Sequence, residues 1–124
     1  MGPGLLVVDA ANVVGSKPDG WWRDRAGAAA RLRDGLVDLN ADGLPDLPGP
    51  LEVVLVVEGR ARDVPGVEGV RVVRAPGSGD DAIVALVAAE GVGRRVVVVT
   101  ADRELRDRVT ALGAEVRGPL AVPR

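Results

Sequence analysis

Apolar residues of this chain are gathered into short, nearly unbroken runs. Runs of this kind at 5–8, 51–57 and 95–100 are rich in Val and Leu, which predicts strands covered on both faces. The run at 69–74 is interrupted by arginines, which favours a strand nearer the sheet edge. A last short strand is predicted at 115–117.

Apolar positions between these strands recur at spacings of three and four, which is typical of amphipathic helices. The spacing predicts helices over about 19–40, 80–90 and 102–112. The apolar stripe of the first contains Trp22, Ala29, Leu32, Leu36 and Leu39, and that of the last contains Leu105, Val109 and Leu112.

Segment 41–50 is dense in Gly and Pro and is predicted to be a connecting loop. The length of 124 residues suits one domain, which we place at 1–118, followed by a loosely held tail at 119–124. Strands that alternate with helices indicate an α/β fold, a parallel sheet with right-handed crossovers and helices on both faces.

Composition narrows the chemistry that this domain can perform. The chain has no Cys and no His, so thiol nucleophiles, Cys/His zinc sites and histidine acid–base catalysis are excluded. The net charge of -2 excludes a strongly basic nucleic-acid coat, so any nucleic-acid contact must be local. The amino terminus shows no basic leader and its apolar run stops at Asp9, so we expect a cytoplasmic protein with no membrane span.

Three acidic positions fall where a strand gives way to a helix, at Asp9, Asp80 and Asp102. Strand-to-helix turns of a parallel sheet open onto one carboxyl edge, so these side chains are expected to converge. Carboxylate oxygens suit hard divalent ions such as Mg²⁺ or Mn²⁺. Asn12 follows Asp9 by one turn, where it is placed to orient the carboxylate or a water.

A structural explanation competes with this one. Asp80 and Asp102 each begin a predicted helix, where an Asp that caps the helix is worth roughly 1 kcal/mol. Asp9 is harder to explain in this way, because it directly follows a buried strand and no helix periodicity places it in solvent. The helix phase makes Asp80 a better ligand than Asp81, and Glu58 is either a fourth member or a solvated loop acid.

Polar residues near the same edge are candidates for contacting a phosphate-bearing substrate. They are Lys17, Arg60, Arg62, Ser78, Thr100 and Arg103. The run at 76–79 lacks the Lys of a phosphate-binding loop, and its glycines more simply permit a tight turn. Trp22 is assigned to the core, whereas Trp21 is left open between packing and an exposed stacking surface.

Three motifs together resemble one known group, the NYN branch of the PIN-like metal-dependent ribonucleases, in which a YacP-like branch is one option. They are Asp9-x-x-Asn12, Gly79-Asp80-Asp81-Ala82-Ile83 and Thr100-x-Asp102. The resemblance implies a single-domain three-layer sandwich with strand order 3-2-1-4-5 and hydrolysis of RNA phosphodiester bonds. It also implies Mg²⁺ or Mn²⁺ held by Asp9, Asp80 and Asp102, with Asn12 and Thr100 orienting ligands or water. Asp81 is a further catalytic candidate whose part in the site the resemblance leaves open.

A different class of function stays open beside the ribonuclease. A noncatalytic module with the same sheet would bind RNA, the ribosome or a protein partner through its surface and would need no divalent ion. A phosphotransfer domain ranks third, because Asp9 lacks the nearby second Asp and the late-strand Lys of such enzymes. The sequence leaves monomer and homodimer as alternatives.

Overall fold

A five-stranded parallel sheet forms the central layer of the computed structural model, which describes residues 2–61 and 63–123. Its strands are β1 (Gly4–Asp9), β4 (Leu51–Val57), β5 (Arg71–Arg74), β6 (Val96–Val99) and β7 (Glu115–Arg117). They lie in the order β5-β4-β1-β6-β7, with every neighbouring pair parallel. Counted along the chain this is the order 3-2-1-4-5, so the predicted topology is confirmed.

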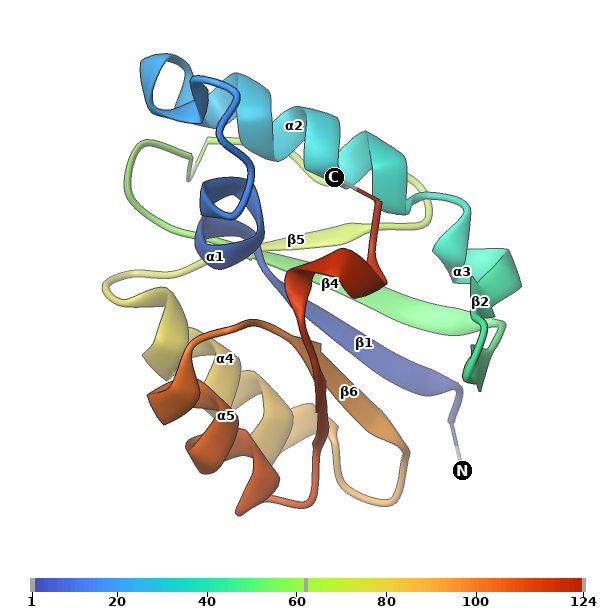
Figure 1. Cartoon of the computed structure of the whole chain (residues 1–124). Coiled ribbons are helices and arrows are strands. Elements are labelled where there is room, and N and C mark those ends of the chain that lie inside the picture. Colours follow the sequence, from blue (N-terminus) through green and yellow to red (C-terminus); the bar gives the residue numbers. More distant parts are fainter. Residues whose placement is uncertain (1, 62, 124) are drawn as a thin grey trace.

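Helices cover both faces of this sheet, as Figure 1 shows. One face carries α1 (Ala10–Gly15) and α2 (Arg25–Leu36), and the other carries α4 (Gly79–Glu90) and α5 (Arg103–Thr110). Alternate residues of β1 divide between the two layers: Leu6 and Val8 pack toward α1 and α2, whereas Leu5 and Val7 pack toward α4 and α5. The three-layer α/β sandwich expected from the sequence is therefore the observed fold.

The single helix predicted over 19–40 is in fact three shorter elements. They are the 3-10 turn η1 (Trp21–Arg23), α2 and the short α3 (Leu39–Asp42). The break has a local cause, because the Asp24 carboxylate accepts a hydrogen bond from the Gly27 N–H at 2.9 Å and so begins a new helix at Arg25. Trp22 falls before this start and is 54% exposed, so its assignment to the core is wrong.

Segment 41–50 is more ordered than the predicted loop. It contains a small antiparallel hairpin of β2 (Gly43–Leu44) and β3 (Leu47–Pro48). Leu44 and Leu47 are buried in the same core layer as α2, so the hairpin closes one end of that layer. The loop prediction considered only the Gly and Pro residues of this segment, and it did not take into account that Leu44 and Leu47 would be buried.

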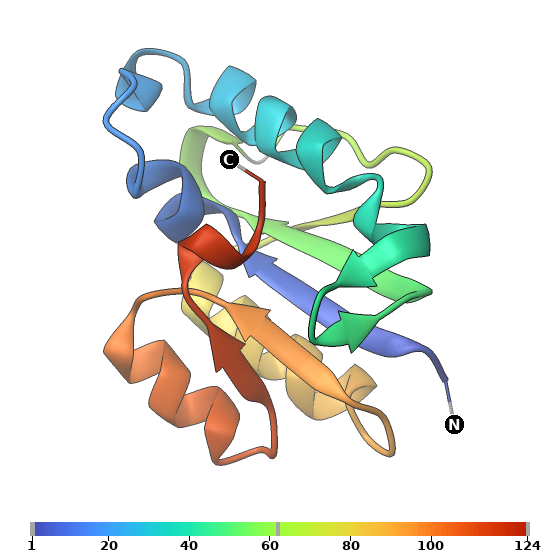
Figure 2. The ribbon, with the colours of Figure 1, turned by 45° about the vertical axis from the view of Figure 1, so that its right-hand side comes forward.

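Within the segment predicted as a tail, the described residues 119–123 lie against the domain. The turn η3 (Pro119–Ala121) leads to Val122, which is 5% exposed and packs in the core layer of α1 and α2. Figure 2 shows this red segment passing from β7 back toward α2. Leu112 also departs from its prediction, because α5 ends at Thr110 and leaves that side chain 47% exposed.

The helices of the described residues are all too short or too polar to cross a membrane.

Candidate functional site

The carboxyl edge of the sheet brings together polar residues from three central strands. Asp9 ends β1, Glu58 follows β4, and Thr100 follows β6. The strand order reverses between β1 and β6, since one crossover from β1 leads outward to β4 and the later ones lead to β6 and β7. Ligands of open α/β sheets bind at such a reversal point, so Asp9 and Thr100 occupy the position where a site is expected.

Asp9 is a buried carboxylate, with 6% of the residue exposed. Its Oδ2 accepts a hydrogen bond from the Thr100 hydroxyl at 2.9 Å, and its Oδ1 accepts one from the Asn12 N–H at 3.4 Å. The second bond makes Asp9 the N-cap of α1, so the capping explanation that was expected only for Asp80 and Asp102 applies to Asp9 as well. Burial raises the pKa of Asp9 to about 6 against the lowering effect of these two bonds, and the negative charges of Asp80 and Glu58 raise it further. The charged groups named here as acting on the pKa of Asp9 are thus both acids, and neither supplies a compensating positive charge.

Thr100 and Asn12 tie the end of β1 to the loop after β6. The Thr100 hydroxyl oxygen accepts a bond from the Asp102 N–H at 3.1 Å while it donates to Asp9. The Asn12 Oδ1 accepts a bond from the Ala101 N–H at 2.8 Å. Sequence positions about 90 apart are thus joined at one point, and the Asp9-x-x-Asn12 and Thr100-x-Asp102 motifs form one hydrogen-bonded unit.

Asp102 is a helix cap, which is the structural role that the sequence analysis set against metal ligation. Its Oδ1 accepts a hydrogen bond from the Leu105 N–H at 3.0 Å and caps α5. The side chain therefore points toward its own helix. Its charge still reaches the site, because it contributes to the raised pKa of Asp80.

Asp80 does not cap α4, although it lies in the first turn of this helix, where its charge suits the helix dipole. The cap of α4 is Ser78, whose hydroxyl accepts a bond from the Asp81 N–H at 3.3 Å. Burial raises the pKa of Asp80, with the charges of Asp102 and Glu58 acting in the same direction and Arg108 opposing them. Asp80 thus faces the acidic side of the edge.

Asp81 points the other way. Its side chain is 74% exposed and pairs with Arg108 of α5 at 3.0 Å. The structure therefore separates the two adjacent acids as the helix phase indicated: Asp80 is directed to the edge, and Asp81 lies across α4 toward α5.

Glu58 is held against the start of α4, where its carboxylate accepts a hydrogen bond from the Gly79 N–H. A Cβ at position 79 would lie 2.7 Å from the Glu58 Oε2, so the contact depends on Gly at that position. Glu58 is therefore fixed beside Asp80 by a contact between two crossovers that are distant in sequence.

A groove of about 570 Å³ opens beside these acids. Glu58 and Asp80 line one part of it, and Trp21 and Arg25 line another. The remaining lining residues are small or apolar: Ala10, Ala11, Val14, Ala29, Gly59, Ala61, Gly77 and Ser78. The volume falls within the usual range of ligand sites, and polar groups are concentrated at its borders.

The donors at this edge fit a hard divalent ion in kind, since all of them are oxygens. The charges of Asp80 and Glu58 act on Asp9, and those of Asp102 and Glu58 act on Asp80, with Arg108 as the opposing positive charge. Within residues 2–61 and 63–123, however, no three Asp or Glu side chains meet in an arrangement able to hold an ion. The side chains of Asp102 and Glu58 are turned toward backbone N–H groups instead.

The predicted substrate contacts are distributed over several surfaces. Ser78 lines the groove itself, and Thr100 is buried beneath Asp9. Arg60 borders a neighbouring hollow of about 490 Å³ together with Arg74, and Gly59 lines both hollows. Arg103 is exposed at the start of α5, and Arg62 lies outside the described residues.

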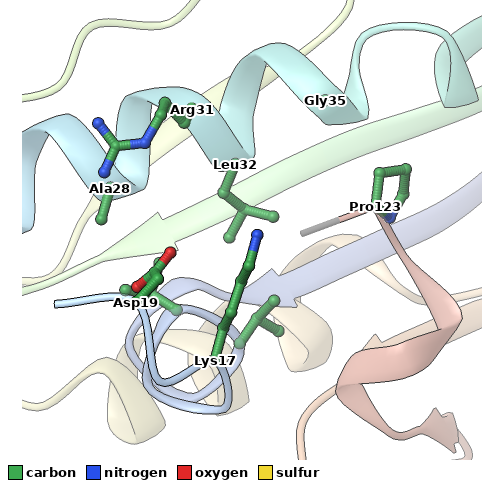
Figure 3. Close-up of a pocket in the computed structure, with 9 residues that line it drawn as sticks. Lys17, Asp19, Ala28, Arg31, Leu32, Gly35 and Pro123 are labelled. Carbon is green, nitrogen blue, oxygen red and sulfur yellow. The ribbon is translucent and has the colours of Figure 1, made fainter. Parts of the chain in front are cut away.

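Lys17 is separated from the acidic edge. It lines a different pocket of about 320 Å³ between α1 and α2, together with Asp19 and Arg31. Figure 3 shows its side chain extending toward Leu32 and Pro123. The structure thus does not bring Lys17 into the groove that Asp80 lines.

Two groove residues were not assigned from the sequence, Arg25 and Trp21, the second of which was left open. The Arg25 guanidinium lies over the Trp21 ring, with its Cζ 5.2 Å from the ring centroid. Their spacing of four residues is the available signal, because residues four apart share one face of the helix that the sequence predicted from 19 to 40.

Comparison with known proteins supports the fold. No protein-family model matches the sequence, and no curated protein sequence resembles it significantly. Among solved structures, the chain is similar to a point mutant of Rae1 (YacP) from Bacillus subtilis, with a TM-score of 0.73 and 19% sequence identity. The likeness covers 95% of this chain and 71% of that one. At this identity it shows a shared fold.

Proposed function

We propose that this protein is a metal-dependent endoribonuclease of the NYN type, which binds Mg²⁺ or Mn²⁺ through Asp9, Asp80 and Asp102. The observation that carries the proposal is Asp9: a buried carboxylate at the reversal point of the sheet, with the acidic Asp80 and Glu58 as electrostatic neighbours. Burial of a charge is costly unless a partner compensates it, and a divalent cation is the partner that oxygen donors of this kind select.

Each residue has a defined part in this proposal. Thr100 and Asn12 hold Asp9 and the loop after β6 in place through the hydrogen bonds described above. Arg60 and Arg74 border the neighbouring hollow, where they are placed to attract the phosphates of an RNA strand. When bound, a hard divalent ion supplies Lewis-acid chemistry suited to phosphodiester hydrolysis.

The likeness to Rae1 (YacP) supports the NYN assignment at the level of the fold. RNA is the partner that we propose, and the cytoplasm is the compartment in which we expect the reaction. Asp102 needs one adjustment in this scheme: its carboxylate has to share its helix-capping bond or turn from it when an ion binds.

The test combines ion binding with RNA cleavage. We expect saturable Mn²⁺ binding by isothermal titration calorimetry and Mn²⁺-dependent cleavage of a labelled RNA, both lost in Asp9→Asn and Asp80→Asn. Asp81→Asn is the matched control, because Asp81 lies on the same turn but pairs with Arg108 outside the groove. Equal cleavage by the wild-type protein and both site variants would contradict the proposal.

One observation favours a second candidate, a noncatalytic module that binds RNA, the ribosome or a protein partner. The carboxylates of the described residues are not gathered into a three-ligand cluster, and a protein that had lost catalysis would have no need of one. This candidate predicts RNA or partner binding that is unchanged by EDTA, together with no saturable Mn²⁺ heat.

A further inference from the structure

The groove beside the acids has two chemically different sides. Asp80 and Glu58 border it from the start of α4 and the end of β4, and Trp21 and Arg25 border it from η1 and the start of α2. The other lining residues are small or apolar, and four of them are alanines. The groove therefore combines an aromatic ring and a guanidinium with two carboxylates, a lining that suits a planar group with polar edges.

Trp21 is presented to the groove by local structure. Gly20 adopts a left-handed φ of 82° and begins η1, and the Trp21 ring then rests beside Gly15 at the end of α1, where a Cβ would lie 3.8 Å from its Cζ2. Arg25 lies over the ring, and the Asp24 cap fixes the backbone between them. The indole and the guanidinium thus form one positively charged border of the groove, called here the Trp21–Arg25 wall, which the Gly20 turn and the Asp24 cap hold in place.

We infer that the groove is a nucleotide subsite, in which an unpaired RNA base stacks against the Trp21–Arg25 wall next to the site of cleavage. Base stacking on an aromatic side chain is tolerant of sequence, and a neighbouring Arg contributes to it. A base within a duplex is already stacked on its neighbours and cannot reach this wall. The proposed substrate class is therefore single-stranded RNA, and this inference rests on the proposed ribonuclease function for its RNA ligand.

Trp22 provides a matched control within the same turn. It is the only other aromatic residue of the chain, is 54% exposed and does not line the groove. Its ring meets that of Trp21 edge to face, with centroids 5.9 Å apart. A general effect of removing a surface tryptophan should appear at both positions, whereas a stacking role belongs to Trp21 alone.

The test measures binding of a short fluorescent single-stranded RNA in EDTA, where cleavage does not interfere. We expect Trp21→Ala to weaken binding by about tenfold, as loss of one base–aromatic stack does. Trp22→Ala should stay within about twofold, and the duplex of the same sequence should bind weakly and equally to all three proteins. Unchanged binding by Trp21→Ala, or equal losses in both variants, would overturn the inference.

A second measurement keeps Trp21 in place and so does not depend on a truncated variant folding. In Trp22→Phe, Trp21 is the sole tryptophan, and its fluorescence should be quenched by the same RNA with the affinity found by anisotropy. Absence of quenching at saturating RNA would also refute the inference. Cleavage by Trp21→Ala at high RNA concentration separates the two ideas, because a failed subsite leaves Mn²⁺-dependent cleavage intact, whereas a failed enzyme leaves stacking without cleavage.

Discussion

The Thr100 hydroxyl donates a hydrogen bond to Asp9 Oδ2 at 2.9 Å and joins the ends of the two strands between which the sheet reverses. Both residues are buried, so water cannot easily replace either side chain as the hydrogen-bond partner of the other. The same hydroxyl oxygen accepts the Asp102 N–H. The Thr100 side chain is therefore a hydrogen-bond partner both of the Asp9 carboxylate and of the backbone N–H of Asp102, directly before α5.

Thr100→Val is expected to lower the free energy of unfolding by about 1–3 kcal/mol, because it leaves a buried acceptor and an N–H without their partner at nearly constant volume. Urea unfolding at neutral pH measures the change. Thr110→Val is the control, since that exposed hydroxyl bonds only carbonyls of its own helix, and we expect a change below about 0.5 kcal/mol. Equal effects at the two positions would show that the Asp9 contact has no special weight.

The raised pKa of Asp9 makes stability depend on pH in a defined direction. The folded chain keeps the Asp9 proton to about pH 6, whereas the unfolded chain loses it near the ordinary Asp pKa of 3.8. Between these values the folded state binds more protons, so this group lowers the free energy of unfolding as pH rises. The penalty is complete above the folded pKa and absent below the unfolded one.

Asp9→Asn removes this penalty, and we expect the variant to be more stable than the wild-type protein at pH 8, by at most about 3 kcal/mol. The difference should shrink as pH falls from 6 to about 4. Thermal or urea unfolding in EDTA at several pH values measures it. A variant that is less stable than the wild-type protein at pH 8 would contradict the assignment of Asp9 as an uncompensated charge.

The carboxyl-terminal segment gives a test of packing with its own control. Val122→Asp places a charge in the core layer of α2, and a loss of more than about 2 kcal/mol is expected on urea unfolding. Leu120→Asp changes a residue that is 82% exposed two positions away and should be nearly neutral. Similar midpoints for the two variants would mean that this segment does not contribute to the fold.

The start of α2 tests the element that positions the stacking wall. Asp24→Ala removes the carboxylate that accepts the Gly27 N–H, at an expected cost of about 1 kcal/mol, and Asp24→Ser should recover most of it. Asp38→Ala is the control, because Asp38 precedes α3 without a side-chain capping bond. If Asp24→Ala and Asp38→Ala cost the same, the cap is not what begins α2.

Strands were the more predictable part of this fold. The apolar run at 51–57 coincides with β4, and the observed limits of the neighbouring strands β1 and β5 differ from the predicted ones by one or two residues. The agreement is close because a strand buried on both faces needs an unbroken apolar sequence. The first and last residues of the helices were harder to predict from the sequence. Nothing in the apolar spacing reports that Asp24 caps a new helix or that Gly20 turns left-handed, and that is why Trp22 was wrongly placed in the core.

The same division holds at the candidate site. The motifs located the strand ends, and parallel topology is sufficient to bring Asp9 near Thr100. The helix phase distinguished Asp80 from Asp81, but other side-chain directions were not accessible, because they depend on contacts between distant segments: Glu58 contacts Gly79, and Lys17 lines the pocket between α1 and α2. Whether Asp102 ligates or only caps is likewise a question of one rotamer, which sequence spacing does not encode.

The bond between Glu58 and Gly79 couples the acidic border of the groove into one unit. While this bond holds, the end of β4 and the first turn of α4 move as one body, so the Glu58 and Asp80 carboxylates keep their places relative to each other.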